Sequence, residues 1–163
     1  PAAADTLPAG NSRGGIAMKI SDIMTRDVHL LSPDQTIREA AGIMADIDSG
    51  ALPVSDNDRL VGMVTDRDIV VRAVAQGKSL DTPVADVMTR EMLYCFESDG
   101  IDDVARNMAK AQIRRLPVVN RAKRLVGIVS LGDLARNDDP TTIGRTVSRV
   151  STPGGKHDQT TTY

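Results

Sequence analysis

The sequence of 163 residues contains one cysteine, Cys95, and two histidines, His29 and His157. A single cysteine excludes an intramolecular disulfide and fits a reducing compartment. No two of these residues have the spacing of zinc ligands, and the acidic residues are scattered, so we expect no metal site. A Cys-His nucleophile pair exists on paper, but Cys95 lies in an apolar segment. We therefore expect a buried structural thiol.

Aromatic residues are also scarce, at 2% of the chain, and tryptophan is missing. A platform that stacks sugars or single-stranded nucleic acid needs aromatic rings, so this composition argues against both. The formal net charge of −2 gives no general attraction to nucleic acid or to an anionic membrane. No apolar run approaches the length of a membrane span, and the residues before Met18 lack the apolar core of a signal peptide. We expect a cytoplasmic protein that binds neither nucleic acid nor membrane.

Aliphatic residues are abundant, and hydrophobic residues make up 40% of the chain. The length suits one compact domain or two small units that share a core. The two ends differ from the middle in composition. Residues 1–17 are rich in Ala, Gly and Pro and are expected to be a flexible leader, and residues 138–163 are expected to be a flexible tail.

The middle of the chain repeats itself at a shift of 64 residues, which becomes 65 after one extra residue in a turn. The matched segments are Asp22-Ile23-Met24-Thr25 with Asp86-Val87-Met88-Thr89, Leu52-Pro53-Val54 with Leu116-Pro117-Val118, and Leu60-Val61-Gly62 with Leu125-Val126-Gly127. Two copies are too few for a solenoid. We expect repeats over 18–79 and 80–137 that pack on each other about a pseudo-twofold axis.

Periodicity gives each repeat the order strand, helix, strand, strand, helix, which is an α/β (α+β) fold of two βαββα units. In the first repeat, Val28–Leu31 is a predicted strand and Ser32-Pro33 the predicted start of the next helix. The predicted buried stripe of that helix is Ile37, Ala40, Ala41 and Met44, and Ile101 and Met108 match Ile37 and Met44 in the second repeat.

Two corners of the sequence carry the candidate chemistry. Thr65-x-x-Asp68 and Ser130-x-x-Asp133 each follow an apolar strand and begin a helix. One interpretation is a capping box. The other is a ribonucleotide site, because a hydroxyl at a helix N-terminus suits phosphate and a carboxylate accepts hydrogen bonds from vicinal hydroxyls. Asp stands where a capping box prefers Glu or Gln, and a glycine precedes each corner and allows close backbone approach, so we favour the ribonucleotide.

The motifs Asp-Ile-Met-Thr, Ala-Leu-Pro-Val and Gly-Met-Val-Thr-Asp-Arg-Asp-Ile, in this order and repeated, resemble the cystathionine-β-synthase (CBS) domain. The chain is similar to a stand-alone CBS pair, or Bateman module, from Ile20 to about Asn137. The resemblance implies regulatory adenosyl ligands, such as AMP, ADP, ATP or S-adenosylmethionine, in clefts between the repeats. It also implies a homodimer built through the helices of the modules.

The resemblance assigns roles by position. Asp68 and Asp133 would hold ribose hydroxyls, Thr65 and Ser130 would lie beside ribose or phosphate, and Thr25 and Thr89, with the backbone near Leu30 and Tyr94, would frame the adenine.

The two repeats differ before the shared Leu-Pro-Val, where Arg114-Arg115 replaces Gly50-Ala51. The resemblance implies that basic residues at this place reach phosphates, whereas the residues alone fit a solvated surface pair as well. Gly50 and Ala51 are the equivalent candidates of the first repeat. That repeat would hold a less charged ligand, use an arginine from across the cleft, or stay empty.

Two functions follow from this. The first is a regulatory module that senses an adenine nucleotide and passes its occupancy to an unknown protein partner. The alternative is a ligand-free dimeric interaction scaffold that works through its surface. We expect no enzyme, because neither repeat offers a matched base and nucleophile, and no obligatory cofactor.

Overall fold

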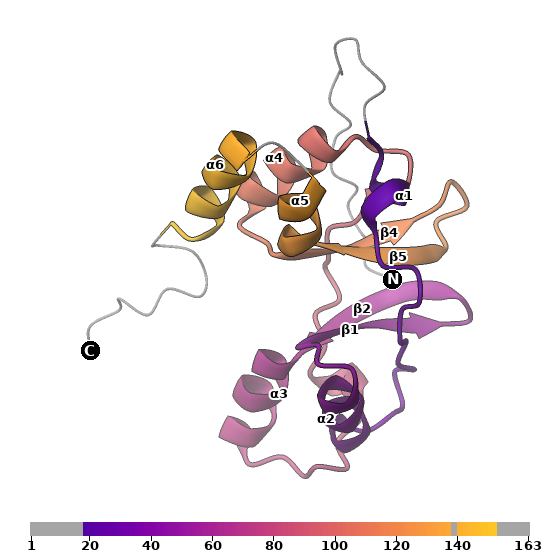
Figure 1. The fold of residues 1–163 in the computed structure, drawn as a ribbon. Coiled ribbons are helices and arrows are strands. Elements are labelled where there is room, and N and C mark those ends of the chain that lie inside the picture. The colour runs from indigo at the N-terminus through magenta and orange to yellow at the C-terminus, as the bar shows by residue number, and fades with distance from the viewer. Residues whose placement is uncertain (1–17, 138–139, 153–163) are drawn as a thin grey trace. The chain divides into compact units, whose positions relative to one another are not determined.

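The computed structural model describes residues 18–137 and 140–152, which form two compact units of helices and small sheets (Figure 1). Within the described chain, unit 1 comprises residues 27–93 and 119–126, and unit 2 comprises the remaining residues. Each unit therefore takes residues from both sequence repeats. The predicted leader over 1–17 lies outside the described residues.

Unit 1 is built on an antiparallel hairpin. Its elements are α2 (Ile37–Asp46), β1 (Ala51–Asp56), β2 (Arg59–Thr65) and α3 (Asp66–Arg72), followed by the short 3-10 helices η1 (Val74–Gln76) and η2 (Val84–Asp86). Ala51 pairs with Thr65 across the hairpin, which brings the start of β1 next to the start of α3. The core between the hairpin and its helices is aliphatic, as the low aromatic content predicts, and contains Leu31, Ile37, Leu52, Val54 and Val64.

The predicted start of the first repeat is wrong in two details. Residues Val28–Leu31 form only one isolated bridge, from Leu31 to Val54, instead of a strand. The N-cap of α2 is Thr36 rather than Ser32. The reason is a local turn, in which the Ser32 hydroxyl donates to Asp34 and the Gln35 N–H donates to the Ser32 carbonyl.

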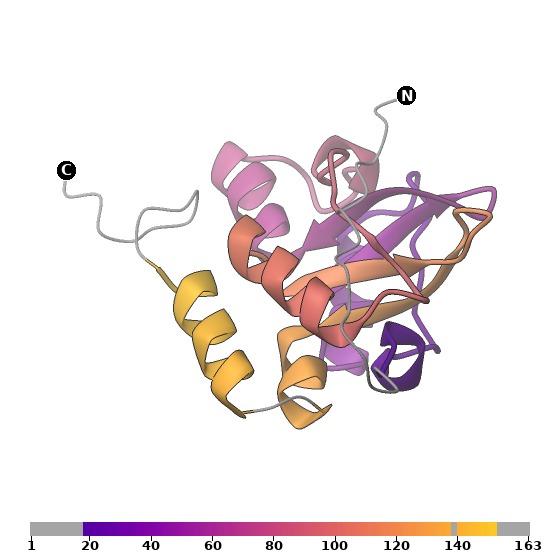
Figure 2. The same ribbon diagram turned by 90° about the horizontal axis from the view of Figure 1, so that it is seen from above.

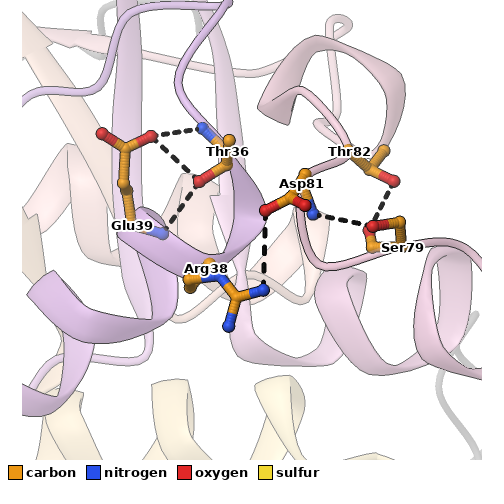
Figure 3. A network of polar contacts seen from close by, with 6 residues as sticks. All are labelled: Thr36, Arg38, Glu39, Ser79, Asp81 and Thr82. Carbon is orange, nitrogen blue, oxygen red and sulfur yellow. Dashed lines mark hydrogen bonds and ion pairs between the residues drawn. The ribbon is translucent and has the colours of Figure 1, made fainter.

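A complete capping box begins α2 (Figure 3). The Thr36 hydroxyl accepts from the Glu39 N–H at 3.2 Å, and the Glu39 carboxylate accepts from the Thr36 N–H at 2.7 Å. The hydrogen bond from Thr36 lowers the pKa of Glu39. This box shares no residue with the corners described below and serves as a control for them.

The segment that begins the second repeat is held on the first turn of α2. The N–H groups of Ile37 and Arg38 donate to the carbonyls of Thr82 and Leu80, and Arg38 lies 3.5 Å from the Asp81 carboxylate (Figure 3). Carbonyls from this segment thus satisfy N–H groups that a helix leaves free at its start. This is why the residues after Ser79 pack in unit 1.

Unit 2 contains α1 (Ile20–Ile23), β3 (Cys95–Phe96), α4 (Ile101–Ala111), α5 (Leu131–Asn137) and α6 (Pro140–Val150). It also contains β4 (Arg115–Val119) and β5 (Leu125–Ser130), except for Val119, Leu125 and Val126, which belong to unit 1. Its sheet has the strand order β3-β4-β5. The predicted mixed α/β fold is confirmed. The predicted buried residues Ile37, Met44, Ile101 and Met108 are buried, whereas Ala41 is exposed, so the buried stripe of α2 is narrower than predicted.

The helix α6 corrects the prediction of a flexible tail over 138–163. It lies beside α4 (Figure 2) and buries Ile143 and Thr146, which are three residues apart and share one helical face. The Gln112 side chain at the end of α4 donates to the carbonyls of Arg149 and Thr152 and so caps α6. The remaining tail residues lie outside the described part of the chain.

Candidate functional site

The unit 1 corner consists of Gly50, Ala51, Thr65 and Asp68, where β2 ends and α3 begins. The Thr65 hydroxyl accepts from the Asp68 N–H at 3.0 Å, and Asp68 Oδ2 accepts from the Thr65 N–H at 2.9 Å. Both bonds of a capping box are therefore present. The pairing of Ala51 with Thr65 places the start of β1 beside them.

The unit 2 corner consists of Arg114, Arg115, Ser130 and Asp133, where β5 ends and α5 begins. Asp133 Oδ2 accepts from the Ser130 N–H at 2.8 Å and from its hydroxyl at 2.7 Å, while the Asp133 N–H donates to that hydroxyl at 3.2 Å. Asp133 is buried, with 8% of its surface exposed. Arg114 and Arg115 are exposed, and the Arg114 carbonyl accepts from the Leu131 N–H at 2.9 Å.

The capping box leaves chemistry available at both corners. In each box the carboxylate uses Oδ2, and its Oδ1 faces an arginine, Arg72 for Asp68 and Arg136 for Asp133. The Arg136 side chain is 69% exposed, so its guanidinium can turn into solvent and leave Asp133 Oδ1 to a ligand hydroxyl. Since a carboxylate accepts about four hydrogen bonds, capping a helix and binding a diol are compatible.

One glycine on β2, Gly62, and one on β5, Gly127, let a second segment pack against the strand that leads into each corner. A Cβ at Gly62 would lie 2.5 Å from Met88 Sδ and 3.1 Å from the Thr89 carbonyl oxygen. A Cβ at Gly127 would lie 2.9 Å from the Thr25 carbonyl oxygen. The sequence predicted that a ligand would approach the backbone at these glycines. In the structure, the Met-Thr pair that ends the repeated Asp-x-Met-Thr motif approaches them instead.

This packing places the predicted adenine-framing threonines. Thr89 exchanges two backbone hydrogen bonds with Met63, at 2.8 and 2.9 Å, in unit 1. Thr25 exchanges two with Ile128, both at 2.9 Å, in unit 2. Each threonine thus shares a unit with the corner of the other sequence repeat. Unit 1 holds Leu30, Gly50, Ala51, Thr65, Asp68 and Thr89, and unit 2 holds Thr25, Tyr94, Arg114, Arg115, Ser130 and Asp133.

Leu30 and Tyr94 differ in their surroundings. Leu30 is 46% exposed. Tyr94 is buried, and its ring packs edge-on against Phe96 with centroids 5.8 Å apart. Because Tyr94 is buried, its side chain would have to leave this contact to reach a ligand.

Arg72 is a residue of this site that the sequence did not reveal. Its NH1 donates to the carbonyls of Val87 at 2.9 Å and Met88 at 3.2 Å and to the Thr89 hydroxyl at 3.3 Å. Its Nε lies 3.6 Å from Asp68 Oδ1. Arg72 therefore joins the predicted ribose and adenine residues of unit 1. The spacing of Asp68 and Arg72 favours an ion pair on α3, but no local pattern relates Arg72 to residues 87–89.

The structure describes two of the three remaining candidates, Cys95 and His29. Cys95 is fully buried as predicted, and burial raises the pKa of its thiol to about 12. His29 is exposed, and His157 lies outside the described residues. Over residues 18–137 and 140–152, no three His, Cys, Asp or Glu side chains gather as a metal site would require. Within the same residues, no helix has the length and apolar character needed to cross a membrane.

Comparison with known proteins gives a consistent result. The model of the CBS domain matches residues 20–74 and 84–139. A curated relative, the CBS domain-containing protein YhcV of Bacillus subtilis, is 48% identical over 118 residues, which are 72% of this chain and 84% of the relative.

Two similar solved structures contain adenosine compounds. The CBS domain pair of protein MJ0100, in complex with 5′-methylthioadenosine and S-adenosyl-L-methionine, is 32% identical with a TM-score of 0.66, and the match covers 74% of this chain and 94% of that one. CBSX2 in complex with AMP is 30% identical with a TM-score of 0.65, and the match covers 72% of this chain and 93% of that one.

Proposed function

Because the chain belongs to the CBS-domain family, with two such domains in tandem, we propose that it is a regulatory module that binds an adenosine-containing ligand. Its role is to signal ligand occupancy to a partner rather than to catalyse a reaction. The observation that carries the proposal is the gathering of a hydroxyl, a carboxylate and a threonine in each unit. In unit 1 these are Thr65, Asp68 and Thr89, and in unit 2 they are Ser130, Asp133 and Thr25.

The chemistry of each group suits one part of such a ligand. Asp68 and Asp133 accept hydrogen bonds from vicinal ribose hydroxyls, and the hydroxyls of Thr65 and Ser130 lie beside them. Two solved structures similar to this chain support an adenosyl ligand of the same class, because one contains AMP and the other contains 5′-methylthioadenosine and S-adenosyl-L-methionine.

Thermal unfolding with adenosine, AMP, ADP, ATP and S-adenosylmethionine tests the proposal. A ligand that binds only the folded protein raises its stability by about 2.7 kcal/mol at one hundred times its dissociation constant. We expect a concentration-dependent rise in Tm for at least one of these compounds, with guanosine and GTP as controls. A chain that none of them stabilises would be the ligand-free scaffold instead.

Phosphate recognition is assigned to the unit 2 corner. Arg114 and Arg115 are exposed and lie next to the start of α5, whereas Gly50 and Ala51 carry no charge at the equivalent place. Changing both arginines to Ala should weaken ATP binding about tenfold or more and leave adenosine binding unchanged. Calorimetry at two salt concentrations measures the affinities for ATP and for adenosine. Added salt should reduce the ATP affinity of the parent protein, because it screens the arginine charges. An equal loss for ATP and adenosine would instead indicate a packing role.

A homodimer is the proposed assembly. Val70 and Val71 on α3 and Val74 on η1 are each between 45% and 57% exposed, and neighbouring exposed apolar side chains mark association surfaces. We propose that this face of unit 1 meets a second copy of the chain.

Charging this face should dissociate the dimer. Light scattering of the parent should give twice the chain mass of 17.4 kDa, and the double variant Val70→Asp, Val74→Asp should give the chain mass itself. Val147→Asp is the control, because Val147 is 42% exposed but lies on α6 in unit 2. A parent protein that is monomeric at micromolar concentration would contradict the dimer.

A further inference from the structure

The two corners can be compared position by position. In unit 1 the Asp66 N–H donates to the Gly50 carbonyl at 3.0 Å, and in unit 2 the Leu131 N–H donates to the Arg114 carbonyl at 2.9 Å. The same backbone hydrogen bond therefore joins the first residue of the helix to the residue before the shared strand. It makes Asp66 the structural equivalent of Leu131, and Gly50 the equivalent of Arg114.

In unit 1 the Asp66 carboxylate lies against Gly50. A Cβ added to Gly50 would meet Asp66 Oδ2 at 2.7 Å and Cγ at 3.1 Å. Asp66 Oδ1 also accepts from the Arg67 N–H at 2.7 Å, which holds the carboxylate in this place. The space that a side chain at position 50 would occupy is thus filled by a negative charge. In unit 2 the matching space belongs to a cation, Arg114.

The two corners therefore differ by two charges, a difference that Arg72 and Arg136, one at each corner, leave unchanged. The residues at positions 50, 51 and 66–68 of unit 1 carry a net charge of −1, because Asp66 and Asp68 outweigh Arg67. The matching residues at 114, 115 and 131–133 of unit 2 carry +1, because Arg114 and Arg115 outweigh Asp133. A phosphate brings a charge of about −1.5 to −2 at neutral pH, so a carboxylate within a few ångströms repels it.

We propose that Asp66 makes the unit 1 corner selective for adenosine compounds without phosphate, either neutral or cationic, while the unit 2 corner takes phosphate-bearing ones. This inference rests on the proposed function and specifies the ligand class of each corner. An acidic residue in the first turn also favours the helix itself. If Asp66 had only that structural role, replacing it would change stability and leave the ligand preference unchanged. The ligand preference therefore separates the structural role from the proposed selectivity.

The experiment isolates the unit 1 corner with Asp133→Ala, which disables the ribose contact of the other corner. In this background calorimetry should detect adenosine or S-adenosylmethionine, and ATP should bind at least about tenfold more weakly. Adding Asp66→Asn keeps the size of the side chain and removes its charge. It should raise the affinity for ATP about tenfold, leave that for adenosine within about twofold, and lose its effect at high salt. Asp66→Leu, the residue found in unit 2, should act in the same way.

The possible failures are distinct. If the Asp133→Ala protein binds ATP as tightly as adenosine, or if Asp66→Asn leaves their ratio unchanged, the role of Asp66 is wrong and the proposed function stands. If the parent binds adenosine compounds but the Asp133→Ala protein binds none, the unit 1 corner is empty. That result overturns this inference and leaves the proposed function standing. If the parent binds none of them, the proposed function fails as well.

Discussion

Replacing Asp133 with Ala should abolish most of the ligand affinity of the unit 2 corner. The carboxylate would accept hydrogen bonds from the two ribose hydroxyls, and hydrogen bonds to charged groups contribute about 1.5–3 kcal/mol each. The loss of both corresponds to at least a hundredfold weaker binding of AMP by calorimetry. An Asp133→Ala protein that binds AMP as tightly as the parent would leave the capping box as the only role of this carboxylate.

Capping must be separated from binding in this test, because Asp133 also accepts from Ser130 at the start of α5. Glu39→Ala is the matched control. It removes an equivalent capping carboxylate from the Thr36 box of α2 and should lower stability without changing ligand affinity. Asp133→Asn is a second control, since it keeps an acceptor for Ser130 while it removes the charge that favours the ribose hydroxyls.

Replacing Gly127 with Ala should destabilise unit 2 by about 1–3 kcal/mol, because the new methyl group has no room. It would lie 2.9 Å from the Thr25 carbonyl oxygen and 2.7 Å from Met24 Sδ. The methionine side chain can move, but the carbonyl belongs to a backbone segment held by two hydrogen bonds to Ile128. In a chain of this size the expected fall in Tm is several degrees, at about 2–4 °C per kcal/mol.

Two other glycines calibrate this measurement. Gly62→Ala should have a smaller effect, because its added Cβ meets the Thr89 carbonyl oxygen at 3.1 Å and otherwise mainly the flexible Met88 side chain. Gly42 lies within α2 with nothing within 4 Å of an added Cβ, so Gly42→Ala should stabilise by about 0.5–1 kcal/mol. Equal Tm values for the Gly127→Ala and Gly42→Ala proteins would contradict the packing argument.

The sequence determined the features that depend on neighbouring residues and on the internal duplication. The two corners follow from a strand pattern that ends in a hydroxyl three residues before an acid, and both capping boxes are present. The buried positions Ile37, Met44, Ile101 and Met108 follow from helical periodicity. Local signals failed at Ser32-Pro33, since Ser32 and Thr36 are both good N-caps. The turn at Ser32 and the distant carbonyls of Leu80 and Thr82 together favour the later start.

Only the tertiary structure decided which distant segments meet. It placed Thr25 against Ile128 and Thr89 against Met63, so that each unit combines a threonine from one repeat with a corner from the other. It also revealed that Arg72 holds residues 87–89 and that the Asp66 carboxylate occupies the space above Gly50. The physical reason is that local propensity and periodicity act over a few residues. Which repeat supplies the threonine beside each corner depends on steric fit at Gly62 and Gly127. It also depends on backbone hydrogen bonds between residues far apart in the chain.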